Sequence, residues 1–155
     1  MQLTLRNYAS GDFETLYAID QVCYPRGIAY SRRTLKWFLA IKGAECLVAQ
    51  AEQEPGSPIV GFIIAEAAGP EGHIITLDVV AEHRRAGVGT SLLREMEQRL
   101  AAGGVRTVLL ETAISNEAAV AFWQRQGYRS VGVVRGYYLG RIDAFEMTKS
   151  LVPFP

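Results

Sequence analysis

AEHRRAGVGTSLL, residues 81–93, joins an apolar strand pattern to a helical pattern through two arginines and a Gly-x-Gly. The N-terminus of such a helix presents N–H groups and the positive end of a dipole. Gly87 and Gly89 let a ligand approach the backbone, and Arg84 and Arg85 add positive charge. The stretch is therefore either a cradle for an anionic group or a strand-to-helix turn with a solvated basic loop.

Two familiar phosphate loops do not fit this stretch. A Walker A loop needs a lysine after its last glycine, and no lysine follows Gly87 or Gly89. The dinucleotide fingerprint needs a glycine three residues after Gly89, where this chain has Leu92. A nucleotide site of either type is excluded.

The composition is typical of one globular domain over residues 1–155. Sixteen basic residues balance sixteen acidic residues, so no excess charge favours nucleic acid or an anionic membrane. Cys23 and Cys46 are too few for a disulfide framework, and with only His73 and His83 we expect no metal site. The N-terminus has no apolar signal region, and no run of 18 apolar residues occurs. We expect a cytoplasmic protein that is a monomer or a homodimer.

The side-chain periodicity predicts one α/β layer with mixed strand directions. The first helix is expected to bury Phe13, Leu16, Ile19 and Val22. A second helix begins after Ser31, and two more lie at about residues 87–102 and 115–127. Strands are predicted at residues 2–8, 44–53, 57–67, 72–80, 105–112, 128–138 and 142–150.

Four ordered motifs carry a resemblance to a known family. They are GHIITLDV, Arg84-x-x-Gly87-x-Gly89, SNEAAVAFW, and GYY followed by DAFEM. In this combination the chain resembles the GNAT superfamily of N-acetyltransferases, and within it the RimI-like and archaeal Ard1-like N-terminal acetyltransferases. The resemblance implies the GNAT fold, a mixed and mostly antiparallel sheet of about seven strands with four helices and splayed central strands.

The resemblance also implies an acetyl-CoA-dependent acyltransferase that uses no metal. The pyrophosphate is expected at the loop of residues 84–90, and the pantetheine arm beside the strand that holds LDV. Asp78 stands where the family usually has a small neutral residue, and its carboxyl has no role in this picture. The cofactor-binding residues implied are Leu77, Asp78, Val79, Arg84, Arg85, Ala86, Gly87, Val88, Gly89, Thr90, Asn116 and Trp123.

The catalytic residues implied are Glu111, His73 and Tyr138. Glu111 and His73 match a glutamate and a histidine of the Ard1-like pattern and would pass the amine proton through water. Without the resemblance, we would interpret His73 as a histidine of an edge strand and Glu111 as the acid of an ion pair with an arginine. Trp123 stands where many members have a tyrosine that assists the departing thiolate. Indole donates a hydrogen bond but is no acid, so we expect activity to survive with Trp123 against the cofactor arm.

The acceptor is expected to be the N-terminal α-amine of a protein or peptide. Tyr137 and Tyr138 match the strand that binds the first substrate residues, and Tyr24, Pro25 and Tyr30 match the opposite wall. Strand packing alone would also explain the tyrosine pair. There are two alternatives. The protein could acetylate a small amine or amino acid, or it could be a coenzyme A-binding module with weak catalysis.

Overall fold

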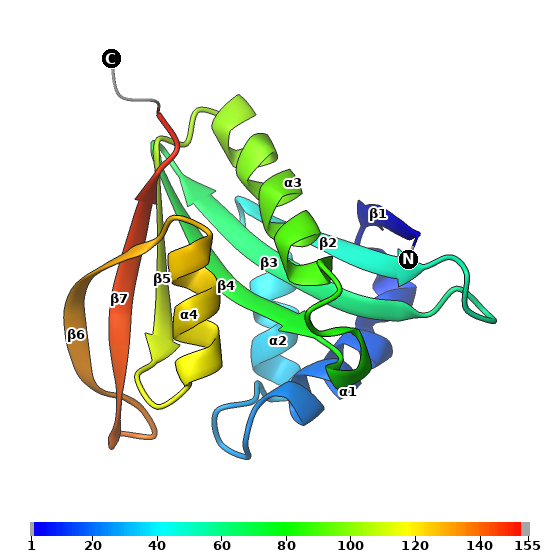
Figure 1. Cartoon of the computed structure of the whole chain (residues 1–155), viewed down its shortest axis with the longest axis horizontal. Coiled ribbons are helices and arrows are strands. Elements are labelled where there is room, and N and C mark those ends of the chain that lie inside the picture. Colours follow the sequence, from blue (N-terminus) through cyan, green and yellow to red (C-terminus); the bar gives the residue numbers. More distant parts are fainter. Residues whose placement is uncertain (1, 153–155) are drawn as a thin grey trace. The chain divides into compact units, whose positions relative to one another are not determined.

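A computed structural model describes residues 2–152, which form seven strands and four helices in the predicted order (Figure 1). The strands are β1 (Leu3–Asn7), β2 (Ala44–Ala51), β3 (Ile59–Ala68), β4 (Glu71–Val79), β5 (Thr107–Ala113), β6 (Arg129–Tyr138) and β7 (Ile142–Ser150). The helices are α1 (Phe13–Cys23), α2 (Arg32–Ala40), α3 (Val88–Ala102) and α4 (Glu117–Arg125), with short 3₁₀ turns at Ser10–Asp12 and Ala81–His83.

The strands follow the order β1-β2-β3-β4-β5-β7-β6 in a seven-stranded sheet. The β1–β2, β2–β3, β5–β7 and β6–β7 pairs are antiparallel, and the β4–β5 pair is parallel. The predicted mixed, mostly antiparallel sheet with four helices is therefore confirmed.

The chain divides into two compact units, and each is described by itself. The first contains the chain up to Glu66 together with Ile74–Arg99, and the second contains Ala67–His73 together with the chain from Leu100 onward. Strand β4 therefore begins in the second unit and continues in the first.

Apolar residues of α1 and α2 pack on one face of β2 and β3 in the first unit. Leu16 and Leu35 are fully buried against Val48, Phe62 and Ile64. Neighbouring residues of a strand point to opposite faces, so Gly61 faces away from this cluster. A Cβ at Gly61 would lie 3.1 Å from Val88 and 3.3 Å from Leu92 of α3. Helix α3 therefore covers the other face of β3 (Figure 1).

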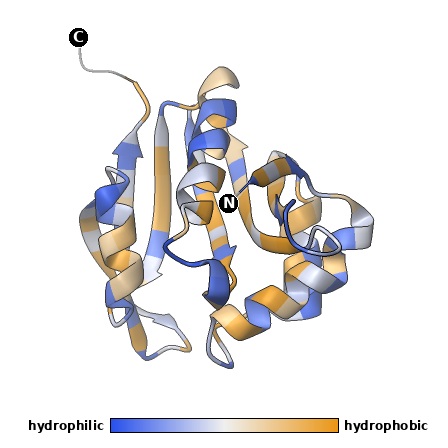
Figure 2. Ribbon diagram, turned by 45° about the vertical axis from the view of Figure 1, so that its right-hand side comes forward, coloured by the Kyte–Doolittle hydropathy of each residue, from blue (hydrophilic) through white to orange (hydrophobic). Residues whose placement is uncertain are grey.

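Helix α1 is amphipathic, and its ribbon alternates between hydrophobic and hydrophilic residues (Figure 2). The prediction for one position was wrong, because the Val22 side chain is 80% exposed. At about 100° per residue, Val22 lies about 120° around the helix from Leu16, whereas Asp20 lies only about 40° away. Asp20 takes the buried position instead and is fully enclosed.

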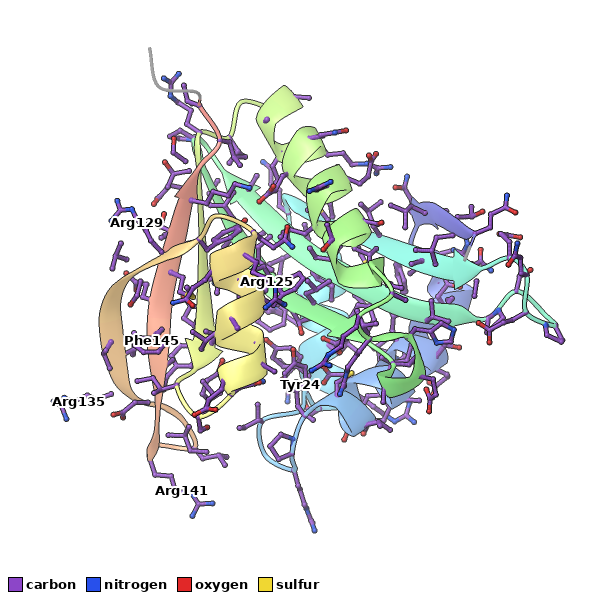
Figure 3. All side chains as sticks on the ribbon, in the orientation of Figure 1. Tyr24, Arg125, Arg129, Arg135, Arg141 and Phe145 are labelled. Carbon is purple, nitrogen blue, oxygen red and sulfur yellow. The ribbon has the colours of Figure 1, made fainter. Side chains whose placement is uncertain are left out.

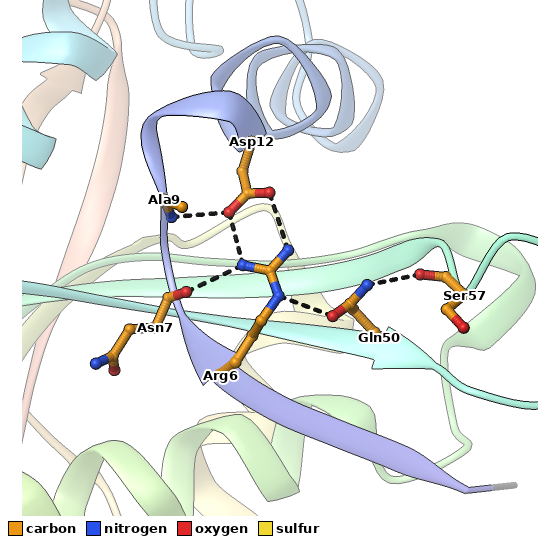
Figure 4. Close-up of polar contacts among 6 residues, drawn as sticks. All are labelled: Arg6, Asn7, Ala9, Asp12, Gln50 and Ser57. Atoms are coloured by element: carbon orange, nitrogen blue, oxygen red, sulfur yellow. Dashed lines mark hydrogen bonds and ion pairs between the residues drawn. The ribbon is translucent and has the colours of Figure 1, made fainter.

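A polar network centred on Arg6 ties β1 to its neighbours (Figure 4). The Arg6 guanidinium donates two hydrogen bonds to Asp12, at 2.8 and 2.9 Å, and one to Gln50 at 2.8 Å. Asp12 also accepts the Ala9 N–H, and Gln50 donates to the Ser57 carbonyl. The network fixes the start of α1 against β2 and the turn that follows it.

Helix α4 and strands β5, β7 and β6 make up most of the second unit. Buried Trp123 packs edge to face on Tyr128, with ring centroids 5.3 Å apart. Strand β6 ends the strand order and is largely exposed. Side chains of Arg135 on β6 and Arg141 in the turn after it extend outward (Figure 3).

Among residues 2–152, no helix combines the length and apolar character needed to span a membrane. Across the same residues, no three histidine, cysteine, aspartate or glutamate side chains gather in a way that could hold a metal ion.

Candidate functional site

His73 and Glu111 of the second unit form a close pair. The parallel register places His73 of β4 opposite Leu109 of β5, two residues before Glu111. The two side chains reach the same point, and His73 Nε2 lies 2.7 Å from Glu111 Oε1. The Glu111 side chain is 17% exposed and that of His73 35%, so the pair is reachable from solvent.

The two consecutive tyrosines of β6 bond to the same glutamate. The Tyr137 hydroxyl donates to Glu111 Oε1 at 3.2 Å, and the Tyr138 hydroxyl donates to the Glu111 carbonyl at 3.4 Å. The β6–β7 register shifts between Val134 and Tyr138, and the preceding residue, Gly136, has φ of +63°. This irregularity lets consecutive residues serve one point, whereas a regular strand would send them to opposite faces.

The electrostatics of this cluster favour a charged carboxylate among neutral phenols. Burial raises the pKa of Glu111. The hydrogen bond and charge of His73 and the hydrogen bond from Tyr137 together outweigh this effect, so the pKa of Glu111 lies below its usual range. Burial and the Glu111 charge raise the pKa of Tyr138 to about 12 and that of Tyr137 still higher. At neutral pH the cluster therefore holds a carboxylate beside an imidazole, an arrangement able to accept a proton.

Asn116 immediately precedes α4, and Trp123 lies on it, in the same unit. The Asn116 side chain accepts the Ala119 N–H at 3.1 Å and so caps the helix, as its sequence position predicted. Trp123 is 8% exposed, with its ring against Tyr128. The contacts of both residues with a cofactor remain predictions.

The glycine stretch forms an exposed loop that leads into α3 in the first unit. Ser91 N–H donates to the Gly87 carbonyl, so the N–H groups of the preceding turn point out of the helix N-terminus. Gly87 has φ of +84° and Arg85 has φ of +65°, and both are exposed. Because Arg85 is not a glycine, its left-handed backbone is a strained feature of the kind found at functional loops.

The exposed side chain of Arg84 bonds back to the end of β4. Its Nε donates to the Val79 carbonyl at 3.0 Å, and its Nη2 lies 3.6 Å from Cys23 Sγ. The side chain therefore braces the end of β4 against α1. Among the arginines of the motif, Arg85 is the better placed to meet an anion at the helix N-terminus.

One edge of β4 bonds to side chains of the α1–α2 segment. The carbonyls of Ile75 and Leu77 accept the hydroxyls of Tyr30 and Tyr24, both at 3.3 Å, so these tyrosines reach β4 (Figure 3 labels Tyr24). The Val79 carbonyl continues the series and accepts from Cys23 Sγ as well as from Arg84. Alternate residues of a strand present N–H and C=O to the same edge.

This edge fits an extended amide-bearing arm. It lies opposite the one that bonds to β3, since Val80 N–H donates to the Val60 carbonyl. An edge of this kind can pair with such an arm as with an added strand. Leu77 and Val79 face this edge and fit the backbone role implied for them, whereas the Asp78 carbonyl points toward Gly61 of β3. Pro25, also predicted at the acceptor wall, is exposed, and its carbonyl accepts the N–H groups of Ile28 and Ala29.

Two polar residues beside this edge, Asp20 and Thr76, were not predicted from the sequence. Asp20 is fully buried on α1, and Thr76 donates to Asp78 at 2.5 Å. The signal that could have found Asp20 is its place on the apolar face of α1, four residues after Leu16. An acid at such a position needs a partner.

Comparison with known proteins places this geometry in context. The model of the acetyltransferase (GNAT) family matches residues 13–128, a range that takes in parts of both units. The N-alpha-acetyltransferase of Saccharolobus solfataricus is 25% identical, over 96% of this chain and 93% of that protein. The [ribosomal protein bS18]-alanine N-acetyltransferase of Escherichia coli K12 is 28% identical, over 93% of this chain and 95% of that protein.

A solved structure has the same fold. The crystal structure of Arabidopsis thaliana NAA60 in complex with acetyl-CoA matches with a TM-score of 0.85 and 20% sequence identity. The match covers 96% of this chain and 98% of that one.

Proposed function

The chain belongs to the acetyltransferase (GNAT) family, and on that premise we propose that it acetylates the N-terminal α-amine of a protein or peptide. Acetyl-CoA is the donor, and it supplies the acetyl group as a thioester. The observation that carries the choice of acceptor is the cluster of Glu111, His73, Tyr137 and Tyr138. The relatives that match almost the whole chain are named for acetylation of α-amines and of an alanine.

The strength of the base in this cluster suits an α-amine. An α-amine has a pKa of about 7.7–8.0 and a lysine about 10.4, so roughly a tenth of α-amines but only about one lysine in a thousand are neutral at pH 7. Glu111, ionised and in contact with His73, is a modest base of the kind that an α-amine requires. We propose that the pair takes the amine proton through water, with Tyr138 close to the reacting atoms.

The remaining site residues bind and orient. We propose that the loop from Arg84 to Thr90 at the start of α3 holds the pyrophosphate, with Arg85 as its charged contact, and that the β4 edge at Leu77–Val79 pairs with the arm. We propose that Tyr24, Pro25, Tyr30 and Tyr137 are the residues that contact the acceptor. The backbone bonds of Tyr24 and Tyr30 to β4 support this, because they leave the segment in one defined position.

The acceptor class is tested by measuring thiol release from acetyl-CoA with four kinds of acceptor. They are peptides with a free N-terminus, the same peptides Nα-blocked but carrying lysine, free amino acids, and polyamines. We expect turnover with the first kind alone. Turnover confined to free amino acids or polyamines would establish a small-molecule acetyltransferase. Tight binding of acetyl-CoA with no turnover of any acceptor would establish a binding module.

Other expectations from the sequence stay predictions. These are the single domain over residues 1–155, the splaying of the central strands, the monomeric or homodimeric state and the cytoplasmic location.

A further inference from the structure

Two aspartates of the first unit are buried together. Asp20 on α1 is 0% exposed and Asp78 on β4 is 1% exposed. Within the part of the chain that the structure describes, neither forms an ion pair with a lysine, arginine or histidine. Two ionised carboxylates enclosed without a basic partner are among the costliest arrangements in a protein interior.

The contacts of the two carboxyls indicate how this cost is avoided. Asp20 Oδ2 accepts the Tyr30 N–H at 2.7 Å, and Asp78 Oδ1 accepts the Thr76 hydroxyl at 2.5 Å. The other oxygens, Asp20 Oδ1 and Asp78 Oδ2, are buried without any other partner. The two side chains interact, because the hydrogen bond and the charge of Asp20 add to burial in raising the pKa of Asp78. A hydrogen bond between two carboxyl groups needs one proton between them.

The neighbouring groups supply no compensating charge. Cys23 of α1, Tyr24 just after it and Cys46 of β2 lie around the pair, and burial raises the pKa of each, so they are neutral at neutral pH. Arg84, which lies beside Cys23, is bonded to Cys23 and to the Val79 carbonyl and makes no ion pair with either aspartate. A proton is therefore the charge that can relieve the pair, and burial together with Asp20 raises the pKa of Asp78 well above its ordinary value.

We propose that Asp20 and Asp78 share one proton, and that this carboxyl pair is a positioning device for the acceptor wall. Asp78 donates the proton to Asp20, which keeps its second oxygen for the Tyr30 N–H. The bond between helix and strand thereby fixes the end of the segment from Tyr24 to Tyr30, whose two terminal tyrosines also bond to β4. The effect on the acceptor rests on the proposed function, and the shared proton does not.

The shared proton is tested by isotope-edited infrared spectroscopy of protein carrying ¹³C-labelled aspartate. At pH 7 we expect one protonated aspartic acid in the wild-type protein and none in Asp78→Asn. Asp12→Asn is the matched control, since the Asp12 carboxylate is paired with Arg6, and it should leave the signal in place. A wild-type spectrum at pH 7 without a protonated carboxyl overturns the proposal.

The positioning role is tested by hydrogen exchange of the Tyr30 amide. Asp78→Asn keeps a donor toward Asp20 and should leave exchange within about twofold of wild type, whereas Asp78→Ala should speed it about tenfold. Amides of β7, in the other unit, serve as the reference for global stability. Equal exchange of Tyr30 in the two variants, relative to that reference, overturns the role.

The kinetic consequence separates this inference from the proposed function. We expect Asp78→Ala to raise the KM of an acceptor peptide about tenfold, and Asp78→Asn to restore it. An unchanged acceptor KM in Asp78→Ala would overturn the effect on the acceptor wall. If the wild-type protein acetylates no peptide, the proposed function fails, while the infrared and exchange results still decide the pair.

Discussion

Replacing Glu111 by glutamine separates a catalytic base from a structural brace. Glutamine keeps the shape of the side chain and an oxygen that can accept from His73 and Tyr137, but it cannot take a proton. The pKa of Glu111 lies below its usual range, so the carboxylate is ionised throughout pH 6–9. The loss caused by Glu111→Gln should therefore persist across that range.

The hydrogen bonds of Glu111 limit how much activity Glu111→Gln would lose if the carboxylate had only a structural role. Glu111→Gln turns the charge-assisted bond to His73 at 2.7 Å and the bond from Tyr137 at 3.2 Å into neutral ones. A charge-assisted hydrogen bond contributes about 1.5–3 kcal/mol and a neutral one about 1 kcal/mol. Because the His73 side chain is 35% exposed, solvent screening brings the difference toward about 1 kcal/mol, or about fivefold in rate. Loss of a general base costs about 10²–10⁴-fold.

We expect kcat/KM for a peptide acceptor to fall at least about 100-fold in Glu111→Gln, measured by thiol release at saturating acetyl-CoA. His73→Ala should cause a loss of similar size, and the double variant little more, because the two residues act as a unit. Glu71→Gln, an exposed carboxylate of the same unit, is the control and should behave as wild type. A loss below about tenfold in a folded Glu111→Gln protein would remove the carboxylate from the chemical step.

Three further outcomes follow from the structure. Arg85→Ala should weaken acetyl-CoA binding about tenfold by calorimetry, whereas Arg94→Ala, farther along the same helix, should not; equal losses would contradict the pyrophosphate loop. Trp123→Tyr should change turnover or coenzyme A affinity by at least about threefold, and no change in either would place the indole away from the cofactor. The hydrogen bond from Arg6 lowers the pKa of Asp12, so its stabilisation is present above the ordinary value and is lost as the pH falls through the folded value. Arg6→Met should therefore lower Tm by about 2–4 °C at pH 7 and by progressively less toward pH 3; a loss independent of pH would contradict this.

The elements with strong local patterns were predictable from the sequence. The strand expected at residues 142–150 is β7 with the same bounds, and the helix expected at residues 87–102 is α3 to within one residue. In both, side chains repeat with the period of the structure, and glycines mark a boundary. Such signals need no knowledge of what the element packs against.

The cluster around Glu111 depended on information outside the local pattern. His73 and Glu111 are 38 residues apart, and only the parallel register of β4 and β5 brings them together. Periodicity assigns both residues to strands but does not say which strands are neighbours. The resemblance to a family supplied that pairing. It could not supply the irregular turn of β6 at Gly136 that lets Tyr137 and Tyr138 both reach the glutamate.

Asp78 shows how an anomaly in a sequence can be interpreted. An acid inside an apolar strand and an acid on the apolar face of a helix are each unfavourable when considered alone, because a single buried carboxylate lacks compensation. Two such acids can remove each other's cost, since one proton neutralises half of the pair and supplies the hydrogen bond for the other half. Asp20 was missed because Val22 was assigned to the buried face in its place, and without Asp20 the carboxyl of Asp78 had no explanation. Unexplained acids at buried positions of different elements should therefore first be tested as partners of one another, before either is assigned to the chemistry of the site.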